Sequence, residues 1–209
     1  MLVSDPTPLI VAPVIPVVTV EPSRDAVPLA RALMAGGLRI VEIALRTPAA
    51  LDAIKAIVAE LPDVIVGAGT VTTPKDIARA DEAGVAFLVT PGMPPALIHA
   101  LRDAPVPVLP GCGTVSEAME LAAMGFPVLK FFPAEPSGGV RWLRSVSEPL
   151  PHIRFCPTGG INADNAASYL ALPNVIAVGG SWVAPAQAIS AGDFEAIAAH
   201  ARTAAALKK

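Results

Sequence analysis

The sequence predicts an α/β fold, a (β/α)8 TIM barrel that residues 1–209 form as a single domain. Short β-branched apolar runs alternate with Ala- and Leu-rich stretches of helical period along the whole chain, and this unit occurs eight times. The runs are apolar almost throughout, which is typical of parallel strands buried on both faces. A doubly wound parallel sheet is the alternative architecture, and the number of units favours the barrel.

The predicted strands follow one another at short intervals. They are expected at residues 14–20, 38–45, 64–67, 85–89, 106–109, 126–132, 153–156 and 175–178. Helix starts between them are expected at the capping residues Thr47, Thr73, Thr114 and Asn162. Pro74 after Thr73, and Glu117 three residues after Thr114, strengthen two of these starts. Helix ends are expected at Gly36, Gly84 and Gly125.

The charge and the placement of prolines exclude two kinds of partner. The chain carries 15 basic and 18 acidic residues, a formal net charge of −3, so it has no excess of positive charge for nucleic acid. Its long uncharged stretch between Asp164 and Asp193 is interrupted by Pro173 and Pro185. A membrane span is therefore not expected either.

The amino-terminal segment and the cysteines indicate a compartment. The segment lacks the Lys or Arg that opens a secretory signal, and Asp5 stands where such a signal would be apolar. Cys112 and Cys156 form no C-x-x-C pair and have no histidine cluster near them. We therefore expect a reduced, cytoplasmic setting and no structural metal.

Lys130 stands inside an apolar strand, the run 126–132. Alternation places Lys130 in the barrel interior, while Leu129 and Phe131 face the helices. An ammonium group taken out of water loses its proton more readily, and the resulting neutral amine is a nucleophile toward ketones. Lys130 is therefore a candidate for imine catalysis. The alternative is a core lysine that is salt-bridged or extends its ammonium group to solvent.

Glu42 is the acidic residue that stands in the middle of a predicted strand, and alternation puts it on the same face as Arg46. Four residues of extended strand separate them by roughly 13 Å, too far for a tight mutual pair. Glu42 is free to neutralise Lys130 across the barrel and to shuttle protons, and Arg46 to bind a carboxylate. The alternative is a purely structural Glu–Lys pair.

Two glycine pairs indicate a phosphate site. Gly159–Gly160 follows the seventh predicted strand and Gly179–Gly180 follows the eighth, the positions at which barrels commonly bind phosphate through backbone N–H groups. The alternative is that both are only tight turns. The segment 67–70 lacks the third glycine of a dinucleotide-binding motif, so we interpret it as a tight strand exit that presents Thr70.

Seven motifs carry a family resemblance over nearly the whole chain. They are VEIALRTP (41–48), VGAGTV (66–71), VTPG (89–92), LPGCGTVSE (109–117), LKFFPAE (129–135), RFCPTGGI (154–161) and VGGSW (178–182). The sequence resembles the 2-keto-3-deoxy-6-phosphogluconate (KDPG) aldolases of the Entner–Doudoroff pathway and their relatives acting on 4-hydroxy-2-oxoglutarate (KHG). These are class I aldolases, which work through a Schiff base.

The resemblance implies reversible cleavage of KDPG to pyruvate and glyceraldehyde 3-phosphate by a homotrimer without metal or cofactor. It implies that Lys130 forms the imine with the C2 ketone and that Glu42 is the proton shuttle. For the pyruvate part it implies a carboxylate site of Arg46 and Thr70 in a pocket lined by Pro91, Phe132 and Thr158. For the distal phosphate it implies a site of Gly159, Gly160, Gly180 and Ser181.

Other functions fit parts of the pattern. A lyase that prefers KHG or the galactonate epimer of KDPG would share all of the chemistry, although Thr158 and Ser181 favour KDPG. A phosphosugar isomerase on the same barrel would use the phosphate loops without an imine. A non-catalytic phosphosugar-binding protein would leave the inward lysine unexplained.

Three residues have no assigned role. Glu21 stands where relatives often present a basic residue, which leaves an anion contact from that loop in doubt. Cys112 is unusual in its loop, and we interpret it as a structural thiol. Glu135 belongs to the LKFFPAE motif, and capping or orienting its loop is the only function that we can suggest for it.

Overall fold

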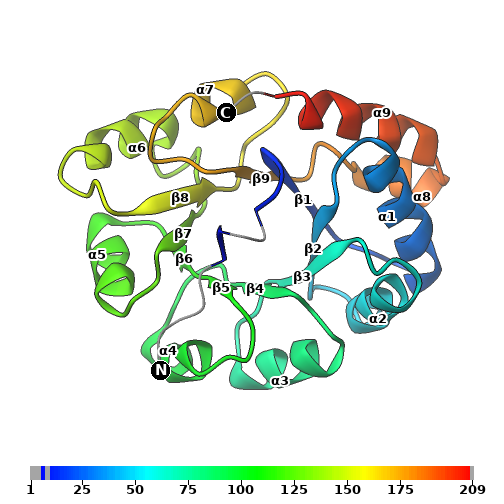
Figure 1. Cartoon of the computed structure of the whole chain (residues 1–209), viewed down its shortest axis with the longest axis horizontal. Coiled ribbons are helices and arrows are strands. Elements are labelled where there is room, and N and C mark those ends of the chain that lie inside the picture. The colour runs from blue at the N-terminus through cyan, green and yellow to red at the C-terminus, as the bar shows by residue number, and fades with distance from the viewer. Residues whose placement is uncertain (1–5, 8–9, 208–209) are drawn as a thin grey trace.

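Strands alternate with helices, and the strands form a ring inside the helices (Figure 1). The structure is a computed structural model that describes residues 6, 7 and 10–207. The strands are β1 (Val14–Val18), β2 (Ile40–Ala44), β3 (Ile65–Gly69), β4 (Phe87–Val89), β5 (Val108–Leu109), β6 (Gly111–Cys112), β7 (Val128–Phe131), β8 (Arg154–Pro157) and β9 (Val178–Gly180). The helices are η2 (Ser23–Asp25), α1 (Ala26–Ala35), α2 (Ala50–Glu60), α3 (Pro74–Glu82), α4 (Pro95–Arg102), α5 (Val115–Ala123), α6 (Gly139–Ser147), α7 (Ala166–Leu170), α8 (Ala186–Ala191) and α9 (Phe194–Ala205).

The strand order closes into a barrel. Parallel ladders join β5-β4-β3-β2-β1-β9 and β6-β7-β8. Pro110 separates β5 from β6, and since proline has no N–H group it interrupts what is otherwise one strand. Isolated bridges from Phe155 to Val175 and from Thr158 to Gly179 join β8 to the β9 segment. This closure confirms the predicted barrel and excludes the doubly wound sheet.

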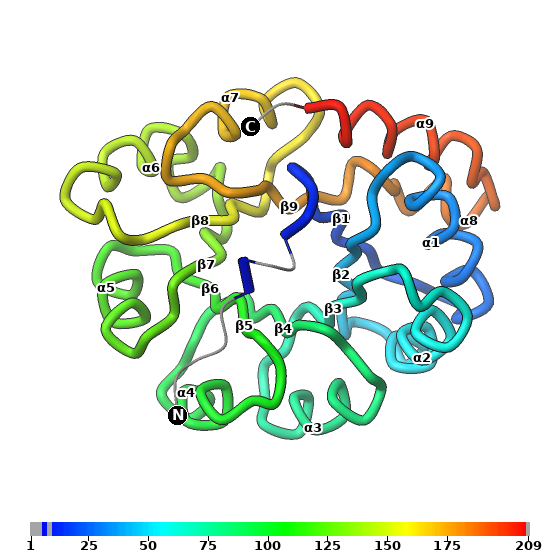
Figure 2. Tube along the Cα trace, viewed as in Figure 1, coloured from blue at the N-terminus to red at the C-terminus, as the bar shows by residue number. Residues whose placement is uncertain are grey.

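The chain winds once around the barrel, and its last helix, α9, packs beside α1 (Figure 2). Gly36 makes this approach possible, because a Cβ atom there would lie 2.6 Å from the carbonyl oxygen of Ala198 in α9. The predicted glycine stops agree with the observed ends of α1, α3 and α5. Among the described helices, none is long and apolar enough to cross a membrane. The amino-terminal residues used to argue against a secretory signal lie partly outside the described residues.

Most predicted strand boundaries lie one or two residues from the observed ones, and two of the differences change where a glycine motif lies. The eighth strand begins at Val178 instead of Val175, because Val178 N–H donates to Pro13 O beside β1 whereas Ile176 N–H still donates to Phe155 O of β8. Gly179 and Gly180 therefore lie within β9, and not in a loop after it. The third strand runs on to Gly69, paired with β2, so the strand exit begins at Thr70.

Two predicted helix starts were right and two were early. Thr73 and Thr114 both form capping boxes, with Asp76 and Glu117 respectively. The hydroxyl of Thr47 instead donates to Val20 O, and α2 begins at Ala50. The side chain of Asn162 accepts hydrogen bonds from the next turn, and α7 begins at Ala166.

The barrel interior and the layer between strands and helices form two separate apolar clusters. The interior cluster is Ile15, Ile40, Phe87, Val89, Leu109, Val128, Cys156 and Ala177. Leu129 and Phe131 belong to the outer cluster, as the alternation along β7 predicts. Lys130 lies two residues beyond Val128 along β7, so it sits nearer the carboxyl ends of the strands, where barrel enzymes carry their active sites.

Candidate active site

A buried ion pair crosses the barrel interior. Lys130 on β7 places its Nζ 3.3 Å from Oε1 of Glu42 on β2, and their side chains are only 6% and 3% exposed. The strand order puts β2 and β7 on opposite walls of the barrel. The ring of Phe132 lies near the same amine, with its centroid 5.3 Å from Nζ. An amine and a carboxylate are thus held in contact where water is largely excluded.

Gly69 makes room for the Glu42 carboxylate. A Cβ atom at this position would lie 2.6 Å from Cγ of Glu42 and would overlap its Oε1. The neighbouring strand β3 is therefore shaped around the acid, and the side chain of Glu42 has little freedom to move toward that wall.

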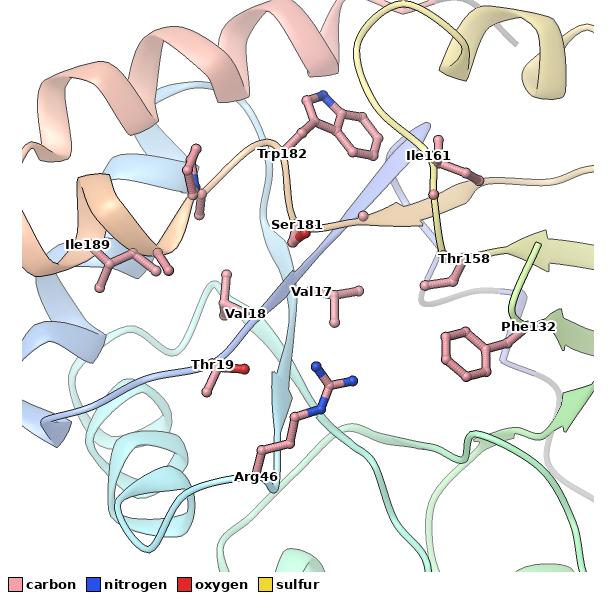
Figure 3. A pocket seen from close by; sticks show the side chains of 16 residues that line it. Val17, Val18, Thr19, Arg46, Phe132, Thr158, Ile161, Ser181, Trp182 and Ile189 are labelled. Atoms are coloured by element: carbon pink, nitrogen blue, oxygen red, sulfur yellow. The ribbon is translucent and has the colours of Figure 1, made fainter. Parts of the chain in front are cut away.

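Arg46 and Thr70 lie together at the ends of adjacent strands. The Nε of Arg46 donates to Oγ1 of Thr70 over 3.1 Å. Thr70 leaves β3 in the left-handed region, with φ of 60°, which redirects the chain at the strand exit. Its hydroxyl orients the arginine, whose terminal nitrogens point toward the centre of the adjoining cavity (Figure 3). A guanidinium held in this way suits a carboxylate ligand.

The cavity has a volume of about 580 Å³ and opens beside Arg46, Phe132 and Thr158 (Figure 3). Of the sequence-predicted residues, it is lined by Arg46, Phe132, Thr158, Gly159, Gly160, Gly180 and Ser181. Lys130, Glu42, Thr70 and Pro91 are not among its lining residues. Phe132 connects the two regions, because it lines the cavity and also lies against the amine of Lys130.

Pro91 lies next to the strand that pairs with Lys130. A Cβ atom at Gly111 would collide with the backbone of Pro91, and Gly111 is the register partner of Lys130. Pro91 therefore lies close to the side of the barrel that carries Lys130, but it does not line the cavity.

The loop after β8, where the sequence predicts phosphate binding, turns through two glycines with positive φ. Gly159 and Gly160 adopt φ of 101° and 79°, values that side chains rarely permit. The carbonyls of Thr158, Gly159 and Gly160 accept hydrogen bonds from Ala134 N, Glu135 N and Asn165 Nδ2, at 2.8, 3.0 and 3.1 Å. These three hydrogen bonds fix the backbone of the loop. In the part of the chain that the structure describes, no cluster of three His, Cys, Asp or Glu residues could hold a metal.

Comparison with known proteins gives the family. The family of KDPG and KHG aldolases matches residues 7–200. The chain belongs to this family. It is thus a lyase of the aldolase class, as the sequence motifs predict.

Two curated members of the KDPG and KHG aldolase family illustrate the similarity. The KHG/KDPG aldolase of Escherichia coli K12 is 47% identical over 196 residues, 94% of this chain and 92% of that protein. The 2-dehydro-3-deoxy-phosphogluconate aldolase of Pseudoalteromonas atlantica is 48% identical over 194 residues, 93% of this chain and 90% of that protein.

Two solved structures of KDPG aldolases are also similar to this chain. The enzyme from Legionella pneumophila, with pyruvate captured at low pH as a covalent carbinolamine intermediate, has a TM-score of 0.95 and 41% identity, over 97% of this chain and 99% of its own. The enzyme from Zymomonas mobilis ZM4 with 3-phosphoglycerate has a TM-score of 0.90 and 42% identity, over 97% and 96%.

Sequence reasoning missed the apolar wall of this aldolase's cavity. That wall includes Val17, Ile161, Trp182, Pro185 and Ile189. Ile161 and Trp182 are the last residues of two family motifs, so those motifs offered a reason to place them at the site. No motif or pattern pointed to the other three. Gly180 fits this wall because a Cβ atom there would collide with the Trp182 ring. Glu21, whose role the sequence left open, lines a neighbouring cavity of about 420 Å³ with Thr19, Gln187 and Ser190.

The fit between Gly69 and Glu42 gives a first prediction. Gly69→Ala should push the Glu42 carboxylate away from Lys130 and lower kcat at least ten-fold, since misplaced catalytic groups lose rate steeply. Gly92→Ala is the matched control, because a Cβ atom there would meet nothing within 4 Å. Steady-state kinetics on both variants decide the matter, and equal activities would show that the close fit has no catalytic consequence.

The two thiols give a second prediction. Burial raises the pKa of both Cys112 and Cys156 from 9.0 to about 12. Neither is in a disulfide. Near neutral pH both should therefore resist a thiol reagent such as dithionitrobenzoate in the folded protein and react when it is unfolded. Because the folded pKa values are raised, the thiols' contribution to stability should be intact below pH 9 and be lost as the pH rises toward about 12. Rapid labelling of the folded protein would contradict the assignment of Cys112 as a structural thiol.

Proposed function

We propose that this aldolase cleaves KDPG to pyruvate and glyceraldehyde 3-phosphate through a Schiff base at Lys130. The observation that carries the proposal is the 3.3 Å contact between the buried Lys130 amine and the Glu42 carboxylate at the carboxyl ends of the strands. A nucleophile in contact with a general base is the arrangement that imine chemistry needs. The carbinolamine captured in the Legionella pneumophila enzyme supports this chemistry in a similar protein.

Imine formation returns Glu42 to the carboxylate form in which it started. Glu42 accepts a proton from Lys130, the neutral Nζ attacks the C2 carbonyl carbon, and a second proton moves from the nitrogen to the C2 oxygen to give a carbinolamine. Glu42 then returns the proton to the C2 hydroxyl, which leaves as water while the nitrogen lone pair forms the C=N bond. Arg46, oriented by Thr70, holds the substrate carboxylate, and Pro91, Phe132 and Thr158 form the pyruvate pocket.

Cleavage breaks the bond between C3 and C4. Glu42, a carboxylate again, accepts the proton of the C4 hydroxyl, and the electrons left on that oxygen form the C=O bond of the aldehyde. The electrons of the broken C3–C4 bond flow into the iminium to give an enamine. Glyceraldehyde 3-phosphate leaves, Glu42 supplies a proton to C3 of the enamine, and water hydrolyses the pyruvate imine to release Lys130. Gly159, Gly160, Gly180 and Ser181 hold the phosphate throughout, and the Zymomonas mobilis structure with 3-phosphoglycerate supports a phosphorylated ligand.

The test combines a cleavage assay with covalent trapping. KDPG, its galactonate epimer and KHG are each supplied, and pyruvate release is followed with lactate dehydrogenase. Borohydride is then added with pyruvate, and the mass of the intact protein is measured. We expect fastest cleavage of KDPG and one reduced pyruvate on the peptide that contains Lys130. Faster cleavage of KHG or the epimer would change the substrate, and the absence of both cleavage and an adduct would favour a phosphosugar isomerase.

We also infer that the chain is a single-domain homotrimer of the cytoplasm, with a small phosphorylated keto acid and pyruvate as its ligands. The family resemblance supports the trimer, and the two unpaired cysteines support a reducing compartment. Light scattering at several concentrations should give three times the monomer mass. A monomer or dimer mass would contradict the trimer.

A further inference from the structure

The loop of Gly159 and Gly160 is held from behind by Glu135, a residue outside the cavity. The backbone N–H of Glu135 donates to Gly159 O over 3.0 Å. The stem of its side chain lies against Gly160, where an added Cβ atom would be 2.6 Å from Cβ and 2.7 Å from Cγ of Glu135. Glu135 thus fixes both glycines, one through its backbone and the other through its side chain.

The carboxylate of Glu135 is itself held by a buried hydroxyl. Tyr169 on α7 is 0% exposed, and its Oη donates a hydrogen bond to Oε1 of Glu135. Burial and the adjacent carboxylate raise the pKa of Tyr169, so the hydroxyl keeps its proton and remains a donor. Gly139 leaves space for this bond, because a Cβ atom there would lie 2.9 Å from Oη and 3.1 Å from Oε1.

These contacts link three segments that meet at the phosphate end of the cavity. Glu135 follows the strand that carries Lys130, Gly159 and Gly160 follow β8, and Tyr169 belongs to the helix after that loop. The position of the loop relative to Lys130 therefore depends on where Tyr169 holds Glu135. A substrate that reaches from Lys130 to the phosphate loop needs the correct distance between the two, whereas pyruvate bound at Lys130 is too short to depend on it.

We propose that Glu135, fixed by Tyr169, is a positioning residue that makes the enzyme selective for phosphorylated keto acids. It acts by setting the geometry of the Gly159–Gly160 loop and makes no contact with the reacting atoms. The proposal rests on the function proposed above. It predicts that loss of the Tyr169–Glu135 hydrogen bond weakens phosphate recognition and leaves imine formation intact.

The test uses Tyr169→Phe, which removes only the donor, and Glu135→Met, which keeps the length of the side-chain stem and removes the acceptor. Glu148→Met, at another exposed glutamate, is the matched control. We expect the KM for KDPG to rise about five-fold in both variants, the effect of losing one hydrogen bond, with kcat within two-fold of wild type. The pyruvate concentration that half-saturates borohydride trapping should stay unchanged. The Kd of inorganic phosphate, measured by calorimetry, should rise by the same factor as the KM.

The outcomes separate this inference from the proposed function. Equal losses for KDPG cleavage and pyruvate trapping would indicate a merely structural role and overturn the inference, as would wild-type behaviour of both variants. Effects that add independently in the Tyr169→Phe/Glu135→Met double variant would overturn the claim that one residue acts through the other. If the wild type neither cleaves KDPG nor traps pyruvate, the proposed function fails, and the phosphate Kd of the variants still tests the loop.

Discussion

Replacing Lys130 with methionine is expected to abolish carbon–carbon bond cleavage and to remove the pyruvate adduct formed with borohydride. Methionine keeps the length of the apolar stem but has no amine, so the carbinolamine cannot form. The loss should exceed about 10³-fold in kcat/KM, because the whole covalent pathway depends on this group. Lys55→Met is the matched control, since Lys55 is exposed on α2. Pyruvate release assays and intact-mass measurement after reduction decide the matter.

The same substitution should also destabilise the protein. It leaves the Glu42 carboxylate buried without a partner, which typically costs about 3–5 kcal/mol in the free energy of unfolding. Adding Glu42→Gln removes the stranded charge, so the double variant should recover most of that loss in urea unfolding, while remaining inactive. Substantial cleavage by Lys130→Met, or an adduct on another lysine, would refute the assignment of the nucleophile.

The second large effect is expected for Glu42→Gln. The amide fits the space beside Gly69 but cannot accept and return a proton, so kcat should fall by about 10²- to 10⁴-fold with little change in KM. In D2O, the exchange of pyruvate methyl protons, which reports protonation of the enamine, should slow by a similar factor. NMR spectroscopy measures that exchange without the cleavage step.

Glu60→Gln is the control for this acid, because Glu60 is exposed at the end of α2. Its turnover should match wild type. If Glu42→Gln exchanged the methyl protons at the wild-type rate, Glu42 would be a structural partner of Lys130 and some other group would carry the protons.

The barrel and its central pair could be predicted because each depends on local pattern. Charged residues in apolar strands are rare, so Lys130 and Glu42 stand out, and strict alternation then fixes the face on which each lies. The contact between the two also needs the ring to close, which the count of units predicted. Strand ends were harder, because a run such as 175–178 is apolar throughout and carries no signal of where it leaves β8 to join β1.

The remainder of the site depends on tertiary contacts that no single segment encodes. Val17 and Trp182 line the cavity, yet an apolar side chain in a strand or loop looks the same whether it packs in a core or against a ligand. Glu135 lay in a recognised motif, but its hydrogen bond joins it to Tyr169, 34 positions further along the chain. The helix start predicted at Thr47 failed for a related reason, since its hydroxyl donates to the distant Val20 O. Asn162 instead caps the local turn at residues 164 and 165, which precedes α7.

The join between β8 and β9 would be strengthened by a phosphate bound at the proposed site. This stretch of the ring is linked through the isolated bridges Phe155–Val175 and Thr158–Gly179, whereas neighbouring strands share continuous ladders. The residues proposed to bind phosphate lie on both sides of this join. Gly159 and Gly160 lie on the β8 side, and Gly180 and Ser181 lie on the β9 side. A bound phosphate would therefore link two strands that share few backbone hydrogen bonds with each other. Phosphate binding would then raise the free energy of unfolding as well as hold the substrate. In a cell rich in phosphorylated sugar acids, the enzyme would therefore resist heat and proteolysis better and stay folded for longer.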